Sequence, residues 1–185
     1  MSSGNEWFTP PSIIRAAKEV MGEINLDPAS CVAANAFVQA ERFYSKEDNG
    51  LLLPWFGNVW LNPPFGRTQQ GRGSNLAHFT IKLNSEYQSG NVKQAILLIP
   101  TNTATSWFVP LWDYPICFPR RRIRFLQPDG QVGQGMSFPT CLVYLGRRAS
   151  RFAEVFSRFG HIAVPDHQHS PRAIELWQAR QEVIA

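Results

Sequence analysis

Apolar residues recur along this chain in two patterns, and each pattern predicts a different kind of element. Spacings of three and four residues predict helices, which we expect at 11–22, 30–35, 76–87, 151–159 and 173–183. Short apolar runs that end at prolines, glycines or polar residues predict buried strands, which we expect at 24–26, 37–43, 59–61, 94–99, 114–118, 123–126, 141–145 and 161–164. Helices and strands alternate over the first two thirds of the chain, which favours an α/β fold with a mostly parallel sheet flanked by helices.

Two polar stretches between these elements add information. Residues 66–75 contain no large apolar side chain, so we expect a mobile loop there, with Ser74 or Asn75 capping the next helix. Pro128-Asp129-Gly130 has the composition of a tight turn. The sequence shows no internal repeat, and its 185 residues predict one domain spanning 1–185.

Two of the predicted strands end in a polar residue that is followed by proline. Asp27-Pro28-Ala29-Ser30 follows one of them, and Asn62-Pro63-Pro64-Phe65 follows another. The carboxyl ends of parallel strands share one edge of a sheet, and ligands of α/β proteins bind at that edge. We therefore expect the chemistry of this protein where these two segments meet.

The second of these segments predicts a rigid turn that presents polar and aromatic groups together. Its two prolines fix two φ angles, remove two backbone donors and push Asn62 into an extended conformation. The turn would offer the Asn62 side-chain amide, the Pro63 carbonyl and the Phe65 ring to a ligand. These groups suit a flat, electron-poor ring that carries an exocyclic amine.

Composition excludes several broad classes of protein. Hydrophobic residues make up 44% of the chain and charged residues 17%, which is typical of a globular protein and not of a disordered one. The net charge of +4 permits a polyanionic partner without requiring one. A purely apolar run such as 95–99 is far too short to span a membrane.

Cysteine usage and the N-terminal residues favour a cytoplasmic protein. Cys31, Cys117 and Cys141 are widely spaced and odd in number, so we expect reduced thiols and neither a disulfide framework nor a zinc site. The first residues lack the basic and apolar regions of a secretory signal. His167 and His169 have metal-like spacing but no third ligand nearby, so we expect no metal.

A series of short segments extends over roughly the first seventy residues. Its members are Glu6-Trp7-Phe8-Thr9-Pro10, Leu26-Asp27-Pro28-Ala29-Ser30, Asn49-Gly50-Leu51, Trp55 and Leu61-Asn62-Pro63-Pro64-Phe65-Gly66. Their order and spacing resemble the phage-encoded DNA N-6-adenine-methyltransferase (Dam-type) family. The resemblance implies one Rossmann-like domain that transfers a methyl group from S-adenosylmethionine to N6 of adenine in DNA, inside a bacterial cell. It leaves the oligomeric state open.

The resemblance gives the proline turn a catalytic role. The target adenine would be flipped out of the duplex into a site built by Asn62, Pro63, Pro64 and Phe65. N6 is a poor nucleophile because its lone pair is delocalised into the ring. Hydrogen bonds from N6 to the Asn62 side-chain oxygen and the Pro63 carbonyl would favour a tetrahedral nitrogen, so that positioning and electrostatics do most of the work.

The resemblance also implies where the cofactor binds. Asp27 would meet the ammonium group of S-adenosylmethionine and Ser30 its carboxylate, while Glu41 or Asp48 would take the ribose hydroxyls or the adenine amine. The residues expected at the cofactor are Trp7, Thr9, Pro10, Asp27, Pro28, Ala29, Ser30, Glu41 and Asp48. The segment after Asp27 lacks the Gly-x-Gly that most methyltransferases have there.

Basic residues in two places indicate contacts with DNA phosphates. One group lies in the polar loop that follows Phe65, and the other forms a cluster after residue 119. The residues expected to bind nucleic acid are Arg67, Arg72, Arg120, Arg121, Arg122 and Arg124.

Two alternatives to DNA adenine methylation stay open at this point. The same turn could present another planar amine to the cofactor, namely a guanine amino group in RNA or a glutamine amide in a protein. A non-catalytic DNA-binding module with a degenerate cofactor site would also account for the missing glycines.

Overall fold

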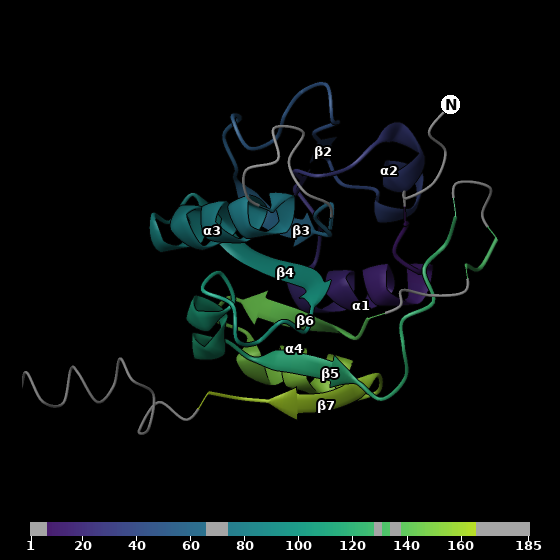
Figure 1. Ribbon diagram of the computed structural model, residues 1–185, viewed down its shortest axis with the longest axis vertical. Helices are drawn as coiled ribbons and strands as arrows, with labels where there is room; N and C mark the ends of the chain where they lie inside the picture. The colour runs from purple at the N-terminus through teal and green to yellow at the C-terminus, as the bar shows by residue number, and fades with distance from the viewer. Residues whose placement is uncertain (1–6, 66–73, 128–130, 134–137, 166–185) are drawn as a thin grey trace, which may run out of the picture.

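A computed structural model describes residues 7–65, 74–127, 131–133 and 138–165 of the chain (Figure 1). Four expectations concern residues outside these ranges: most of the loop at 66–75 with Arg67 and Arg72, the turn at 128–130, the helix at 173–183, and the pair His167 and His169. These four remain predictions, as does the division of the chain into a single domain.

The centre of the fold is a seven-stranded sheet with the order β2-β1-β3-β4-β6-β5-β7. The strands are β1 (Leu26–Asp27), β2 (Arg42–Phe43), β3 (Gly57–Leu61), β4 (Val92–Pro100), β5 (Ile116–Pro119), β6 (Thr140–Leu145) and β7 (Gly160–Ala163). The predicted strands at 59–61, 94–99, 114–118, 141–145 and 161–164 are thus confirmed within a few residues at their ends.

The sheet is mixed, and the prediction that it would be mostly parallel is wrong. β2, β1, β3 and β4 pair in parallel, whereas the pairings of β4 with β6, β6 with β5 and β5 with β7 are antiparallel and contain more of the paired residues. A parallel return needs a long crossover, usually a helix. The described residues between β5 and β6 contain no helix, so β6 returns in the opposite direction.

Helices cover both faces of the sheet, which confirms the α/β class. They are α1 (Pro11–Met21), α2 (Val32–Val38), α3 (Asn75–Gln88), the 3-10 turn η1 (Val109–Asp113) and α4 (Ala149–Phe156). Alternate residues of β4 point to opposite faces: Ile96 and Leu98 join α1 and α4 in one core, and Leu97 and Ile99 join α3 in the other. Among the described residues, no helix combines the length and the apolar character needed to cross a membrane.

The predicted strand at 37–43 is mostly wrong, because its first two residues belong to α2. Cys31 caps this helix by accepting a hydrogen bond from the backbone N–H of Ala34. The side chain of Asn35 then bonds to the backbone of Ala40 in both directions, and Gln39 takes a left-handed φ of 53°. The helix therefore extends through Val38 before the chain turns, and only Arg42 and Phe43 remain for β2.

The predicted strand at 123–126 is also absent as a regular strand. Leu126 forms only isolated bridges, to Phe8 and to Val132. This segment therefore connects the end of β5 to the N-terminal residues around Phe8 without forming a strand of the sheet.

One edge of the sheet collects most of the segments that were singled out from the sequence. β1 leads through α2 to β2 on one side, while β3 lies on the other side of β1. This reversal of strand order marks the point where α/β sheets bind ligands, outside the carboxyl ends of the strands. Figure 1 shows the arrowheads of β4 and β5 pointing the same way, since β6 is antiparallel to both. Asp27 at the end of β1, Asn62 after β3 and Arg120 after β5 therefore all lie at the carboxyl edge.

Candidate functional site

Asn62 is placed by the most regular part of the sheet. Val59, Trp60 and Leu61 are buried in β3 and pair in register with β4 up to Leu97. The prolines that follow end the strand, and the Asn62 side chain turns toward the N-terminal segment at residues 7–10.

The Asn62 amide is held in a single orientation. Its Nδ2 donates a hydrogen bond of 3.2 Å to the backbone carbonyl of Trp7 and a longer one of 3.4 Å to Oγ1 of Thr9. A carbonyl oxygen can only accept, so the nitrogen of the amide must face Trp7 and the oxygen must face the other way. That oxygen, Oδ1, is buried and has no hydrogen-bond partner in the structure. An acceptor left in this state costs about 1–3 kcal/mol, which a donor on a ligand would recover.

The N-terminal segment that orients Asn62 is itself anchored. Phe8 exchanges two backbone hydrogen bonds with Leu126, of 2.9 and 2.8 Å. The ring of Trp7 lies so close to Gly133 that a Cβ at position 133 would overlap it. Thr9 is buried, with 4% of its surface exposed. Residues 7–9, held by contacts with Leu126 and Gly133, thus fix the orientation of the Asn62 amide.

Asp27 supplies a carboxyl group at the same edge. It is buried, and burial raises its pKa to about 7, although the backbone N–H of Ala29 donates a 3.3 Å hydrogen bond that opposes the shift. The hydroxyl of Ser30 also lowers this pKa from nearby, yet its oxygen is buried without a partner that satisfies hydrogen-bond geometry. Two of the three buried side-chain atoms that lack a partner in the described residues, Ser30 Oγ and Asn62 Oδ1, thus belong to the two segments at this edge.

Three of the short segments that carry the family resemblance, at Asp27–Ser30, at Asn49–Leu51 and at Trp55, are in contact in the structure. The carbonyl of Pro28 approaches Gly50 so closely that any side chain at position 50 would collide with it. Trp55 Nε1 donates a 2.7 Å hydrogen bond to the Gly50 carbonyl. The glycine of Asn49-Gly50-Leu51 is therefore required by the packing behind the Asp27 turn, a role that the sequence alone did not assign.

The two acidic candidates for the ribose lie in different places. Asp48 is exposed in the loop after the carboxyl end of β2, where the backbone N–H of Ser45 donates a 2.7 Å hydrogen bond to it and holds its pKa below the usual value. Glu41 precedes β2 and accepts a 3.1 Å hydrogen bond from Asn25, which precedes β1. The structure therefore puts Glu41 at the amino ends of these strands and does not bring it to Asp27.

Phe65 is half-buried at the end of the proline turn. Its ring meets Phe138 edge-on, with 5.7 Å between the ring centroids. Pro63 is buried and Pro64 exposed, so the turn presents one side to the core and the other to solvent. The sequence did not predict that Phe138 contacts Phe65. The aromatic residue and proline at 138–139, just before β6, were the sequence feature that could have indicated this contact.

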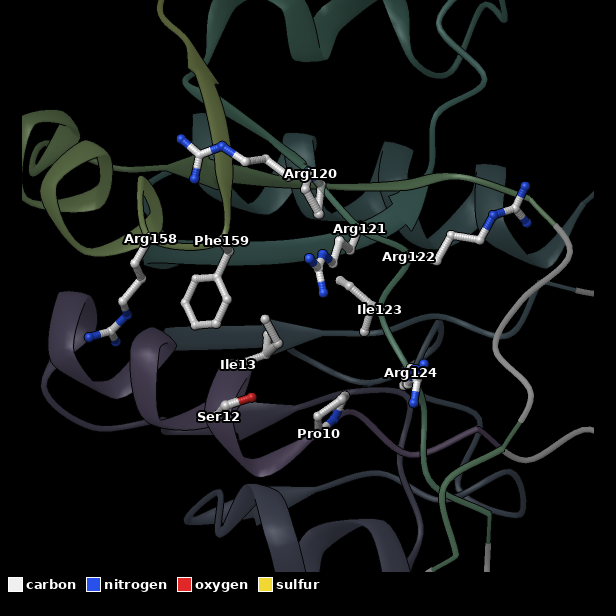
Figure 2. Close-up of a pocket in the computed structure, with 11 residues that line it drawn as sticks. Pro10, Ser12, Ile13, Arg120, Arg121, Arg122, Ile123, Arg124, Arg158 and Phe159 are labelled. Atoms are coloured by element: carbon white, nitrogen blue, oxygen red, sulfur yellow. The ribbon is translucent and has the colours of Figure 1, made fainter.

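The arginine cluster after β5 lies in one place. Arg120, Arg121, Arg122 and Arg124 line a pocket of about 410 Å³ that begins at Pro10 (Figure 2). Arg158 lines the same pocket, and the sequence gave no reason to connect it with the others. Among the described residues, no group of three or more His, Cys, Asp or Glu side chains could hold a metal ion.

Comparison with known proteins gives a family match over most of the chain. The family model described as DNA N-6-adenine-methyltransferase (Dam) matches residues 1–157. Neither curated proteins nor solved structures give a significant match.

Proposed function

Because the chain belongs to the DNA N-6-adenine-methyltransferase (Dam) family, we propose that it transfers a methyl group from S-adenosylmethionine to N6 of adenine in DNA at the Asn62 turn. The single observation that carries this proposal is the state of the Asn62 side chain. Its oxygen is buried, oriented and without a donor, as an acceptor site for an exocyclic amine requires.

The proposed role of Asn62 is to polarise the amine. N6 would donate one hydrogen bond to Asn62 Oδ1 and the other to the Pro63 carbonyl, and one of its two protons would leave to solvent as the methyl group takes its place. Both acceptors favour a more tetrahedral nitrogen, whose lone pair then points away from the ring and is available for attack. The half-buried ring of Phe65 would support the face of the adenine, which has to leave the base stack to reach this turn.

Asp27 and Ser30 fit one end of S-adenosylmethionine. When bound, the cofactor supplies an electrophilic methyl group on a sulfonium. The buried Asp27 carboxyl would bind its ammonium group, and that positive charge would favour the ionised form of the carboxyl. The Ser30 hydroxyl, which lies near Asp27, would donate to the cofactor's carboxylate. Asp48 is the remaining candidate for the ribose hydroxyls, since its loop leaves β2 at the same edge.

The direct test is a search for the methylated product. Purified protein is incubated with S-adenosylmethionine labelled in its methyl group, together with separate pools of DNA, RNA and unrelated protein. We expect label in DNA alone, recovered as N6-methyladenine after digestion to nucleosides. Label in RNA or in protein glutamine would contradict the choice of acceptor.

A second measurement addresses the non-catalytic alternative. Calorimetry with S-adenosylmethionine should show saturable binding by the wild-type protein. Absence of both binding heat and label would indicate a module that has lost its cofactor site, and would overturn the proposal.

A further inference from the structure

The pocket beside the N-terminal segment is defined by arginines, and we call it the arginine groove. Its lining residues come from the start of α1, from the end of β5 and the segment after it, and from the turn between α4 and β7. Five of them are arginines and none carries a carboxylate. The groove therefore concentrates positive charge in a chain whose net charge is only +4.

Part of this charge is not neutralised within the described residues. Arg158 makes a 2.8 Å ion pair with Glu19, outside the lining, and Arg120 donates to the Ser157 carbonyl. Arg121 and Arg124 are exposed and form no ion pair in the described part of the chain. Two guanidinium groups are thus available to an anion.

The floor of the arginine groove is apolar. Ile13 and Ile123 are buried there, and Phe159 is half-buried with the Arg158 guanidinium 5.2 Å from its ring centroid. Figure 2 shows the guanidinium of Arg121 between Phe159 and Ile123, with Arg124 at the side near Pro10. Cations above an apolar floor suit a sugar–phosphate chain, because deoxyribose is largely apolar between its charged phosphates.

The arginine groove is connected to the Asn62 turn through a few residues. Pro10 lines the groove, and its neighbour Thr9 accepts the hydrogen bond from Asn62 Nδ2. Leu126, two residues beyond Arg124, is bonded to Phe8 of the same segment. The arginine groove and the proposed acceptor site thus share the segment at residues 8–10.

We propose that the arginine groove binds backbone phosphates of the DNA strand that carries the target adenine, with Arg121 and Arg124 making the principal contacts. Guanidinium groups bind phosphate oxygens in pairs and keep their charge at every physiological pH. The assignment rests on the proposed function for the identity of the polymer, and it adds Arg158 and the start of α1 to the residues expected from the sequence.

The test compares two double variants that remove the same charge. Arg121→Gln with Arg124→Gln changes the groove, whereas Lys93→Gln with Arg147→Gln changes two exposed cations at the amino edge of the sheet. Binding of a fluorescent mixed-sequence DNA duplex is measured by anisotropy over a series of salt concentrations. Each lost phosphate contact reduces the slope of log K against log salt by about 0.9. We expect the groove variant to lose about 1.8 from the slope and roughly tenfold or more in affinity near 0.1 M salt.

Further variants and readouts separate the groove from the catalytic proposal. Arg121→Lys with Arg124→Lys keeps the charge and should restore most of the slope. S-adenosylmethionine binding and thermal unfolding should match the wild type in all variants. If the groove variant binds DNA with wild-type affinity and slope while methylation proceeds, the groove assignment is wrong and the proposed function stands. If the wild type methylates nothing but binds DNA through these arginines, the proposed function is wrong and the arginine groove remains a DNA-binding site.

Discussion

The two edges of the sheet differ in how completely the side-chain amides there are hydrogen-bonded. At the amino edge, Asn58 Nδ2 donates to the Met21 carbonyl and Asn58 Oδ1 accepts from Gln94, whose own oxygen accepts from the Tyr144 hydroxyl at 2.9 Å. At the carboxyl edge, Asn62 uses its nitrogen in the same way but leaves its oxygen without a donor.

This difference separates two asparagines at opposite ends of one strand. Asn58 lies in β3 and Asn62 directly follows it, and both bond to backbone carbonyls distant in sequence. Only the network around Asn58 is closed by its own neighbours, which stabilises the fold. The unpaired acceptor at Asn62 has no such partner among its described neighbours, which is why we propose it as a ligand site.

The largest expected effect is the loss of activity in Asn62→Ala. The missing acceptor matters most as the N6 nitrogen becomes tetrahedral, so methylation should fall by about 100-fold or more. The free energy of unfolding should change by less than about 1 kcal/mol, because removal of the unpaired, buried oxygen offsets the loss of the two hydrogen bonds that Nδ2 donates. Turnover at the wild-type rate would contradict the role given to Asn62.

The next effect concerns Asp27 and pH. Because burial raises the pKa of Asp27 from 3.8 to about 7, the folded protein holds a proton that the unfolded chain has released between these values. The free energy of unfolding should therefore fall as pH rises from about 4 to about 7, by an amount on the order of a few kcal/mol, and then level off. Asp27→Asn should lack this slope in denaturant titrations at several pH values.

The affinity for S-adenosylmethionine should rise with pH over the range in which the free energy of unfolding falls, because both depend on the ionisation of Asp27. The ammonium of S-adenosylmethionine prefers the ionised carboxyl, so wild-type affinity should increase toward pH 7, while Asp27→Asn should bind weakly at every pH. An identical pH dependence of cofactor affinity in both proteins would show that Asp27 does not bind the cofactor.

Asn58→Ala should show the reverse of Asn62→Ala. It removes the hydrogen bonds that Asn58 gives to the Met21 and Glu23 carbonyls and the one that it accepts from Gln94. Gln94 still bonds to Met21 and Tyr144, and we expect a loss of about 1–3 kcal/mol in denaturant-induced unfolding. Methylation per folded molecule should stay within about twofold of the wild type. A large loss of turnover would mean that the two edges are coupled.

The smallest effect is expected for Thr9→Val. This variant keeps the volume of Thr9 but removes Oγ1, which accepts the 3.4 Å hydrogen bond from Asn62 Nδ2. The hydrogen bond from Asn62 Nδ2 to the Trp7 carbonyl remains. We expect a several-fold loss in kcat with little change in the affinity for DNA, and recovery in Thr9→Ser. Thr9→Ser serves as the control for a purely steric effect.

The sequence predicted the elements whose signals are local. α1 begins at Pro11 and ends before Gly22, and α3 begins after Ser74, as the prolines, caps and apolar spacing indicate. The meeting of Asp27 and Asn62 at one edge also followed from the rule that parallel strands share their carboxyl ends.

Features that depend on contacts between distant residues were not predictable in this way. The reversal of β6 depends on how a long connection folds back, and no local residue pattern encodes it. The orientation of Asn62 by Trp7 and Thr9 joins residues more than fifty positions apart. Arg158 enters the arginine groove only because the turn after α4 packs near α1, which the charge of the residue does not reveal.

The anchoring of residues 7–10 has a consequence for the order in which the site matures during synthesis on the ribosome. Asn62 and its prolines emerge early, yet the segment that orients the amide is also held by Leu126 and Gly133, which emerge much later. A nascent chain halted before these residues would carry every chemical group of the Asn62 turn and still lack its geometry. Competence would then arrive late in translation, once the second half of the chain has closed over the first.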